Sequence, residues 1–278
     1  MMQFLMILDD PEIARFVCQH DEIMPMVDLE TLGKAERQGH LNTWKSKHVP
    51  ADITRIREAV PHAHLVVRVN PIHPGSQAEI DDAIARGADA VMLPMFFEMD
   101  ELARFCDMLA GRAEALPLFE TARSVQQLPE MVHQLGLRRL HIGMNDLHLD
   151  LGMSFLFEPL LRGILEEPAA AMRAAGTVFG IGGLARAHEG VVSPEYLLGE
   201  HVRLGSTAAI LSRTFHRNPA SLQEMQASMD FAAELAALQS IHAAFRRKTA
   251  EELEANRRIT HDRIADVVRL IEARTGRA

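Results

Sequence analysis

Short apolar runs alternate with amphipathic segments along about the first 215 residues of the chain. Eight runs have the length of a strand, at Phe4–Leu8, Ile23–Leu29, Leu65–Val69, Ala90–Met95, Leu116–Phe119, Leu140–Gly143, Val178–Ile181 and Ala208–Ser212. Between most of them, apolar residues recur at helical spacing, at Pro11–His20, Ala51–Val60, Gln77–Arg86, Asp100–Arg112 and Ser124–Gly136. Near-continuous apolar strands separated by helices indicate a parallel sheet that is buried on both faces.

Eight such units predict an α/β protein that is a closed (β/α)8 barrel, or TIM barrel, with extra helices at its C-terminal end. The structural alternative is an open, doubly wound sheet. Such a sheet more naturally carries a glycine-rich phosphate turn after its first strand, whereas this chain has Leu8, Asp9, Asp10 and Pro11 there. The closed barrel is therefore the favoured architecture.

The end of the chain carries more helix than a barrel needs. Residues Ser221–Gly276 are almost wholly helical in pattern, and no tandem repeat or low-complexity linker separates them from the rest. We expect residues 1–278 to form a single barrel domain, with 221–278 as a helical C-terminal extension. These helices either pack as a hairpin against their own barrel or pack on a neighbouring subunit to form a homo-oligomer.

Composition and charge narrow the class of protein. The 278 residues are 47% hydrophobic and 24% charged, which is ordinary for a soluble globular protein. A net charge of -9 argues against nucleic acid or an anionic membrane as the main partner, and leaves a small anionic substrate possible. The two cysteines suggest no disulfide framework. No apolar window approaches the roughly 18 to 20 residues that span a bilayer, and the N-terminus lacks a signal-peptide pattern. We therefore expect a cytoplasmic protein.

Two carboxylates, Glu120 and Asp146, follow apolar runs of strand length. If both runs are parallel strands of one barrel, the two acids meet at the same rim, where such barrels build their active sites. Such a pair repels unless a cation lies between the two groups. Oxygen ligands without Cys or His beside them favour a hard ion, so the sequence predicts a Mg²⁺ or Mn²⁺ site.

Three more charged residues end neighbouring strands. Arg68 lies near the end of an apolar run, where a guanidinium needs an anion; a substrate carboxylate or developing oxyanion is favoured over a structural carboxylate as its partner. Asp28 and Glu30 alternate at the end of the second strand and point to the same side. They are candidates for tuning a catalytic pKa or holding water on the metal; the alternative is that one of them pairs with Arg68 or caps the next turn.

The long connection Glu30–Pro50 is polar and lacks clear periodicity, which favours a functional loop or lid over the barrel mouth above a plain solvated connection. It carries His40 and His48, two candidates for a general base. Three other histidines are weaker candidates, because most of the 14 must be structural: His73, His141 and His148. Gly180–Gly183 would either approach an anionic group or make a tight turn. None of the four lysines lies in a strand, so a Schiff-base mechanism is disfavoured.

Five motifs, in this order and at these intervals, resemble the HpcH/HpaI aldolase and citrate lyase beta-subunit family: MVDLET, VVRVNP, GADAVMLPMF, LFETARSV and IGMNDLHLDLG. The resemblance runs from about Met24 to Phe215. It implies a (β/α)8 barrel, usually trimeric or hexameric, with Mg²⁺ or Mn²⁺ held by Glu120 and Asp146. It also implies that Arg68 contacts the substrate oxyanion and that backbone amides around Met144 and Asn145 help to hold the substrate carboxylate.

One position departs from the family pattern. The residue after the second acid of the strand-two motif is a histidine in the aldolase branch and an aspartate in the citrate lyase branch, whereas here it is Thr31. The proton-transfer group is therefore open, with His40, His48 or a metal-bound water as candidates.

Taken together, the residues and the resemblance predict a divalent-metal-dependent carbon–carbon lyase, an aldolase of the class II type. Its substrate would be a small 2-oxo acid such as a 4-hydroxy-2-oxo acid, cleaved or formed through a metal-bound pyruvate enolate. One alternative is an acyl-CoA lyase of the citryl-CoA or malyl-CoA kind. The other is a non-catalytic barrel that binds a carboxylate ligand, which the loss of an acid or histidine at Thr31 leaves open.

Overall fold

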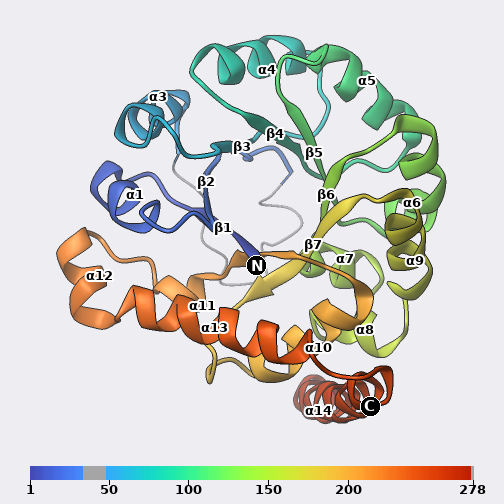
Figure 1. Ribbon diagram of the computed structural model, residues 1–278. Coiled ribbons are helices and arrows are strands. Elements are labelled where there is room, and N and C mark those ends of the chain that lie inside the picture. The colour runs from blue at the N-terminus through green and yellow to red at the C-terminus, as the bar shows by residue number, and fades with distance from the viewer. Residues whose placement is uncertain (34–47, 277–278) are drawn as a thin grey trace.

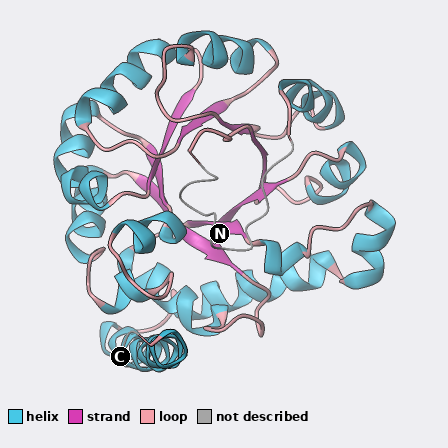
Figure 2. Ribbon diagram, turned by 180° about the vertical axis from the view of Figure 1, so that it is seen from behind, coloured by secondary structure: helices cyan, strands magenta, loops and turns pink. Residues whose placement is uncertain are grey.

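The structure is a computed structural model that describes residues 1–33 and 48–276. Eight parallel strands close into a barrel in chain order, because the last strand pairs with the first. The strands are β1 (Gln3–Ile7), β2 (Ile23–Asp28), β3 (Val66–Arg68), β4 (Ala90–Leu93), β5 (Glu114–Phe119), β6 (Arg139–Ile142), β7 (Val178–Leu184) and β8 (Ala208–Leu211). Figure 1 and, from behind, Figure 2 show the ring of strands inside a ring of helices. The predicted closed barrel is confirmed, and the open-sheet alternative is wrong.

The helices begin and end where local chemistry permits. At α1, Pro11 occupies the first turn and the Asp10 carboxylate accepts hydrogen bonds from the backbone N–H groups of Glu12 and Ile13. At the end of α6, Gly136 takes a left-handed φ of 60° that stops the helix. The helices around the barrel are α1 (Pro11–Val17), α3 (Pro50–Ala59), α4 (Ser76–Ala85), α5 (Met99–Leu109), α6 (Ala122–Leu135), α7 (Met144–Asp150), α8 (Glu158–Leu161), α9 (Glu166–Ala175), α10 (Pro194–Leu204) and α11 (Arg213–His216).

The strand period of two separates the two cores of the barrel. Residues that point outward pack against the helices and form the large apolar core. The inward-pointing ones form a second, smaller apolar cluster inside the barrel, made of Leu5, Met24, Met26, Val66, Ala90, Met92, Leu116 and Leu118. On β2, the same alternation brings Asp28 to the interior two residues after Met26, so charged groups follow the apolar ones toward the carboxyl ends of the strands.

The C-terminal helices pack against their own barrel. They are α12 (Leu222–Ser228), α13 (Phe231–Phe245) and α14 (Ala250–Thr275), and both α13 and α14 pack on α10. The Asn256 amide donates to the backbone oxygen of Tyr196 at 3.0 Å, and Gly199 leaves the space for it, since a Cβ there would lie 2.1 Å from the amide nitrogen. The C-terminal helices thus pack on their own barrel, as Figure 1 shows beside α10, and their part in an oligomer stays a prediction.

The seventh strand is longer than the pattern predicted. The glycines at 180–183 lie inside β7 and not in a turn after it, and the β7–β8 pairing is irregular between Gly180 and Gly183. Gly182 has a φ of 52°, which a residue with a side chain adopts with strain. The tight-turn interpretation of this cluster is therefore wrong, and the glycines are part of the barrel wall.

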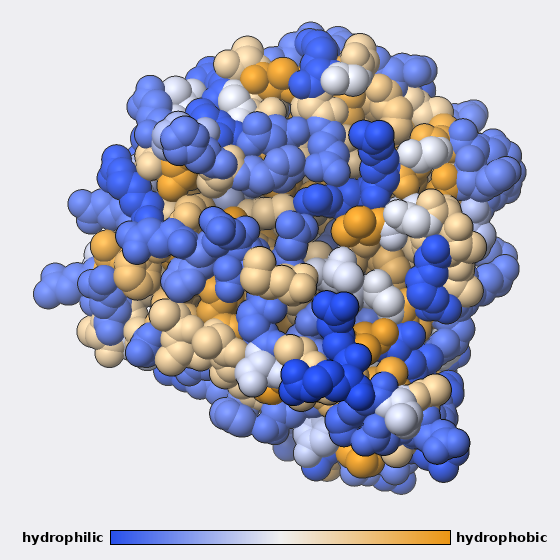
Figure 3. Space-filling model, in the orientation of Figure 1, coloured by the Kyte–Doolittle hydropathy of each residue, from blue (hydrophilic) through white to orange (hydrophobic). Residues whose placement is uncertain are grey.

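The surface seen in Figure 3 is largely polar, with apolar side chains in small separate patches. Within residues 1–33 and 48–276, no helix combines the length and the apolar character needed to cross a bilayer. Both cysteines, Cys18 and Cys106, are free thiols.

Candidate active site

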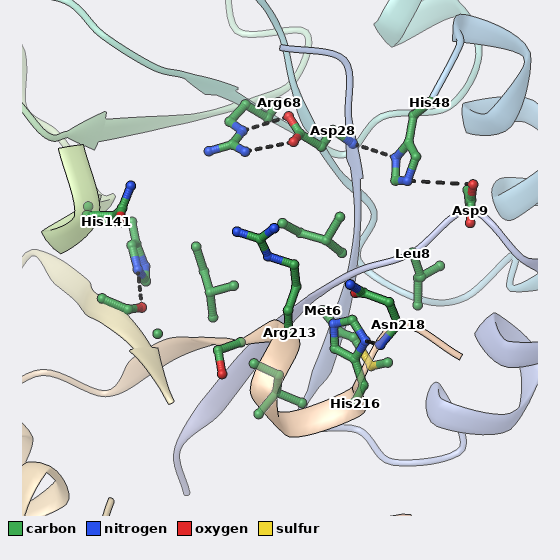
Figure 4. A pocket seen from close by; sticks show the side chains of 18 of the residues that line it. Met6, Leu8, Asp9, Asp28, His48, Arg68, His141, Arg213, His216 and Asn218 are labelled. Carbon is green, nitrogen blue, oxygen red and sulfur yellow. Dashed lines mark hydrogen bonds and ion pairs between the residues drawn. The ribbon is translucent and has the colours of Figure 1, made fainter. Parts of the chain in front are cut away.

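A cavity of about 730 Å³ opens at the carboxyl ends of the strands. Its lining includes Glu120, Asp146, Asp28 and Arg68, four of the residues predicted for the site. They come from β2, β3 and the segments that follow β5 and β6, far apart in the chain. The structure thus brings the two predicted metal ligands and the predicted oxyanion-binding arginine to one cavity. Figure 4 shows part of it.

Arg68 is held by the strand next to its own. The β2–β3 register places Asp28 beside Arg68, and the guanidinium donates from Nε to Oδ1 and from Nη2 to Oδ2, both at 2.8 Å. Glu30 Oε2 lies 3.5 Å from Nε. Arg68 thus has the structural carboxylate partner that was considered from sequence, and its contact with a substrate anion stays a prediction.

These contacts fix both the direction and the charge of Arg68. Burial acts to lower the pKa of Arg68, but the charges of Asp28, Glu30 and Glu120 and the hydrogen bonds to Asp28 raise it above its usual value. The guanidinium is therefore a permanent cation in a fixed orientation. Two bonds to one carboxylate also leave the Nη1 hydrogens for other acceptors.

Glu120 is 3% exposed and directly follows β5. Its Oε1 accepts a hydrogen bond of 3.1 Å from the backbone N–H of Met95, a residue with a left-handed φ of 49° in the segment after β4. A left-handed backbone is costly for a residue with a side chain, and such strain concentrates at functional sites. The strained turn aims an amide at the carboxylate and so orients it.

Asp146 lies in the first turn of α7, which begins directly after β6. Gly143 caps this helix and contacts Glu120: a Cβ on Gly143 would lie 2.7 Å from Glu120 Oε2. The glycine thus leaves space beside that oxygen, on the helix turn that carries Asp146. Met144 and Asn145, predicted to bind a substrate carboxylate through their amides, line the cavity at the same turn.

The chemistry of these donors fits a hard divalent ion. Within the described part of the chain, no three His, Cys, Asp or Glu side chains are grouped to hold an ion by themselves. Glu120 and Asp146 offer carboxylate oxygens, and Mg²⁺ commonly keeps several waters and binds through one or two carboxylates together with substrate oxygens. The residues therefore suit an ion whose coordination a substrate and water complete.

The proton-transfer candidates lie in different places. His40 lies outside the described residues, whereas His48 lines the cavity. Its Nδ1 accepts a hydrogen bond of 3.0 Å from the backbone N–H of Asp28, and its Nε2 lies 3.8 Å from Asp9 Oδ2 (Figure 4). In the neutral ring the proton is therefore assigned to Nε2. Thr31 faces Asn70, to whose Oδ1 its N–H donates at 2.8 Å.

The three weaker histidine candidates each contact another group of the protein, and His141 also lines the cavity. His141 lies inside the barrel and bonds the backbone oxygen of Gly182 through Nε2 at 3.0 Å; burial, opposed by this bond and aided by Arg68, lowers its pKa to about 4. Burial also lowers the pKa of His148, whose Nδ1 lies 3.3 Å from the backbone oxygen of Met144. His73 pairs with Glu79 at 3.1 Å.

Several cavity residues were missed from sequence, among them Asp9, Arg213, His216 and Asn218. Asp9 follows the first strand and Arg213 the last, so the rule that singled out Glu120 and Asp146, a charge just after a strand, applies to both. Burial, and next the positive charge of Arg213, lower the pKa of His216 to about 4. His216 is therefore a neutral ring at pH 7.

The chain is similar to solved structures of low sequence identity. The HpcH/HpaI aldolase of Desulfitobacterium hafniense DCB-2 has a TM-score of 0.57 at 14% identity, over 90% of this chain and 94% of that chain. The citrate lyase beta subunit from M. tuberculosis, complexed with oxaloacetate and magnesium, has a TM-score of 0.58 at 17% identity, over 87% of this chain and 97% of that chain. CitE from Mycobacterium tuberculosis, in complex with magnesium, acetoacetate and coenzyme A, has a TM-score of 0.57 at 17% identity, over 93% of this chain and 85% of that chain.

No protein-family model matches the sequence, and no curated protein matches it significantly. The similarity to the solved structures confirms, at the level of the fold, the resemblance that the motifs predicted. This chain has the (β/α)8 barrel of the HpcH/HpaI aldolase and citrate lyase beta-subunit structures.

Proposed function

We propose that the protein is a divalent-metal-dependent carbon–carbon lyase, an aldolase of the class II type that cleaves or forms a small 2-oxo acid. The observation that carries this proposal is the meeting of Glu120, Asp146 and Arg68 in one cavity at the carboxyl ends of the strands. The neighbouring structure with oxaloacetate and magnesium supports it, because that ligand is a 2-oxo acid.

Glu120 and Asp146 would hold the ion, which when bound supplies Lewis-acid chemistry at a keto oxygen. The surroundings of Glu120 orient its carboxylate. The Met95 amide orients one oxygen of Glu120, and the glycine at 143 keeps the space beside the other oxygen open. A carboxylate that is already oriented loses less conformational freedom when it binds a cation, which lowers the cost of binding.

Arg68 would neutralise the negative charge that develops on the 2-oxo oxygen as the carbon–carbon bond breaks. A fixed donor aimed at developing charge in a closed site is worth several kcal/mol of transition-state stabilisation. Asp28 does the fixing through two bonds to the guanidinium, and Glu30 adds a second negative charge beside it. The predicted roles of Asp28 and Glu30 in catalysis are thus proposed to act through Arg68.

The proton of the distal hydroxyl must go to a base when the substrate is cleaved. His48 remains a candidate, but its Nδ1 must first leave the Asp28 amide before this nitrogen can take a proton. In the geometry of Figure 4 the ring instead helps to position Asp28. His40 and a water are the other candidates. A His48→Gln variant distinguishes the roles: a base shifts the pH profile of kcat, whereas a positioning group lowers kcat at every pH.

The test is exchange of the methyl protons of pyruvate with D₂O, followed by NMR in the presence of Mg²⁺ or Mn²⁺. We expect metal-dependent exchange, together with cleavage of 4-hydroxy-2-oxo acids. No exchange would reject the proposal and favour a barrel that only binds carboxylates. Turnover of citryl-CoA or malyl-CoA without turnover of free 2-oxo acids would instead favour the acyl-CoA lyase alternative. The similar solved structure that contains coenzyme A is the reason to test it.

We also propose that the helical extension at 221–278 supports assembly into a trimer or hexamer. On α14, Ile259 and Leu270 are 48% and 59% exposed, although both are large apolar side chains. Burial of such residues in an interface would remove their contact with water. Light scattering after size exclusion measures the mass, and a monomer of 31.0 kDa would contradict this proposal.

A further inference from the structure

Arg213 reaches the cavity from the last strand. Ser212, at the end of β8, donates its backbone N–H to the Leu184 oxygen of β7 at 2.9 Å, and Arg213 begins α11 directly after it. Two residues on, the Phe215 oxygen accepts a hydrogen bond of 2.8 Å from Arg186 Nε, a side chain that is itself buried. The backbone of this segment is therefore anchored on both sides of Arg213, and Figure 4 shows its side chain extending into the cavity.

The arginines that line the cavity differ in whether a carboxylate pairs with them. Arg55, Arg68 and Arg213 all line it. Arg55 pairs with Asp52, and Arg68 pairs with Asp28. Among residues 1–33 and 48–276, Arg213 makes no ion pair with a carboxylate, so its charge faces the cavity without a counter-ion from the described chain. Its neighbour His216 is neutral at pH 7 and adds no competing charge.

Arg68 and Arg213 therefore differ in how their positive charges are balanced. Around Arg68 the carboxylates of Asp28, Glu30 and Glu120 outnumber the one guanidinium, which suits a metal ion and the 2-oxo acid half of a substrate. Arg213, in contrast, carries a positive charge that no carboxylate of the described residues pairs with. A guanidinium binds carboxylate and phosphate oxygens with directed, charge-assisted hydrogen bonds. The volume, about 730 Å³, is within the range of pockets that enclose a whole small molecule.

We propose that Arg213 binds an anionic group, a carboxylate or a phosphate, on the substrate half that leaves as the aldehyde. The enzyme would then select acidic aldehydes over neutral ones of the same length. This inference rests on the proposed lyase function. It adds a specificity-determining residue on the β8 side of the cavity to the groups on β2 and β3 and directly after β5 and β6.

The experiment measures kcat/KM for addition of pyruvate to matched aldehydes. Glyoxylate is compared with glycolaldehyde for a carboxylate, and glyceraldehyde 3-phosphate with glyceraldehyde for a phosphate. In Arg213→Leu we expect the preference for the acidic member of at least one pair to fall about 10- to 100-fold, the range for hydrogen bonds to a charged group. The pair that responds identifies the anion. Arg213→Lys should keep part of the preference, because the charge remains.

The matched control is Arg217→Leu. Arg217 lies on the same segment but does not line the cavity and pairs with Glu189 at 2.8 Å, so its removal should leave the preference as in the wild type. A preference in Arg213→Leu equal to that of the wild type would overturn the inference. An equal loss for acidic and neutral aldehydes would also overturn it, since that pattern indicates a structural role.

A binding measurement separates this inference from the proposed function. Calorimetric titration with malonate and with inorganic phosphate requires no catalysis, and we expect Arg213→Leu to weaken binding of one of them about 10-fold or more. If the wild type does not exchange the protons of pyruvate but its anion binding depends on Arg213, the lyase function is rejected and the role of Arg213 in anion binding is kept. Intact exchange, with anion binding that is independent of Arg213, would reject the role of Arg213 alone.

Discussion

The two ends of the barrel interior are built from the same strands but from opposite kinds of residue. On β2, Met26 is fully buried in the apolar cluster, whereas Asp28, the next inward-pointing residue, is buried against Arg68. On β5, Leu118 and Glu120 show the same change. A step of two residues along the chain therefore separates the part of the barrel that stabilises the fold from the part that we propose binds substrate.

The parallel sheet explains why this change happens at one end only. All eight strands run in the same direction, so every segment that follows a strand emerges at the same rim. A charge buried halfway along a strand would find no water and few partners, and its desolvation would be costly. At the rim, Asp28 and Arg68 can satisfy each other. The comparison can be tested by changing each end separately.

The largest effect is expected from Glu120→Gln at the charged end. Glutamine keeps an acceptor for the Met95 amide but loses the negative charge, so the fold should remain while metal-dependent pyruvate exchange falls at least about a thousandfold. Exchange rates by NMR and melting by circular dichroism measure the two effects.

The control for this change is Glu158→Gln. Glu158 is also a buried glutamate, but it lies on α8, where it bonds Arg162 at 2.9 Å and the Ser154 amide at 3.0 Å. Exchange should continue in this variant. If Glu120→Gln kept activity to within tenfold of the wild type, the charged end would not be the metal-dependent centre.

The next largest effect is expected from Met26→Ala at the apolar end. Removing a fully buried methionine leaves a cavity, which costs about 2–5 kcal/mol of the free energy of unfolding. Met26→Leu, which nearly conserves volume, should cost less than about 1.5 kcal/mol. Urea unfolding measures both. Exchange per folded molecule should change little, and a loss as large as that of Glu120→Gln would erase the distinction between the two ends.

Much of this architecture could be predicted from sequence because it depends on local periodicity. Runs of apolar residues at strand length located β1 to β8 within a few residues, and the rule that a charge just after a strand lies at the rim placed Glu120 and Asp146 in the cavity. Both inferences need only the direction of the strands and the alternation of side chains.

The partner of Arg68 could not be predicted in the same way. Asp28 is 40 residues away in the chain, and the bidentate pair depends on the β2–β3 register, which no local pattern reveals. The glycines of β7 were misread for a related reason. Glycine is depleted in strands, but here its missing side chain makes room for side chains from neighbouring elements, His141 of β6 at Gly180 and Met144 of α7 at Gly182.

Acid should weaken the interior through its histidines. Burial lowers the pKa of His141 to about 4 and, with the charges of His242 and His141, that of His201 to about 3. The unfolded chain takes up these protons near pH 6.5, so stability is full above this pH and falls toward pH 4 and 3. By pH 5, each ring should lower the free energy of unfolding by about 2 kcal/mol.

The measurement is urea unfolding at pH 7 and at pH 5 for the wild type and for His201→Asn, which keeps an acceptor near Ser206. The variant should lose less stability than the wild type between the two pH values, by about 2 kcal/mol. Equal losses would show that the buried ring titrates normally.

The last change is Gly180→Ala, at the boundary between the two ends. A Cβ on Gly180 would lie 2.3 Å from His141 Nδ1 and 3.0 Å from the backbone oxygen of Ala208, so the ring must move. Overpacking of this kind costs about 1–3 kcal/mol. Because the closest atom belongs to one side chain, the double variant with His141→Ala should recover part of the loss. No recovery would place the strain in the β7–β8 backbone, and the boundary would then be set by the strand pairing and not by the histidine.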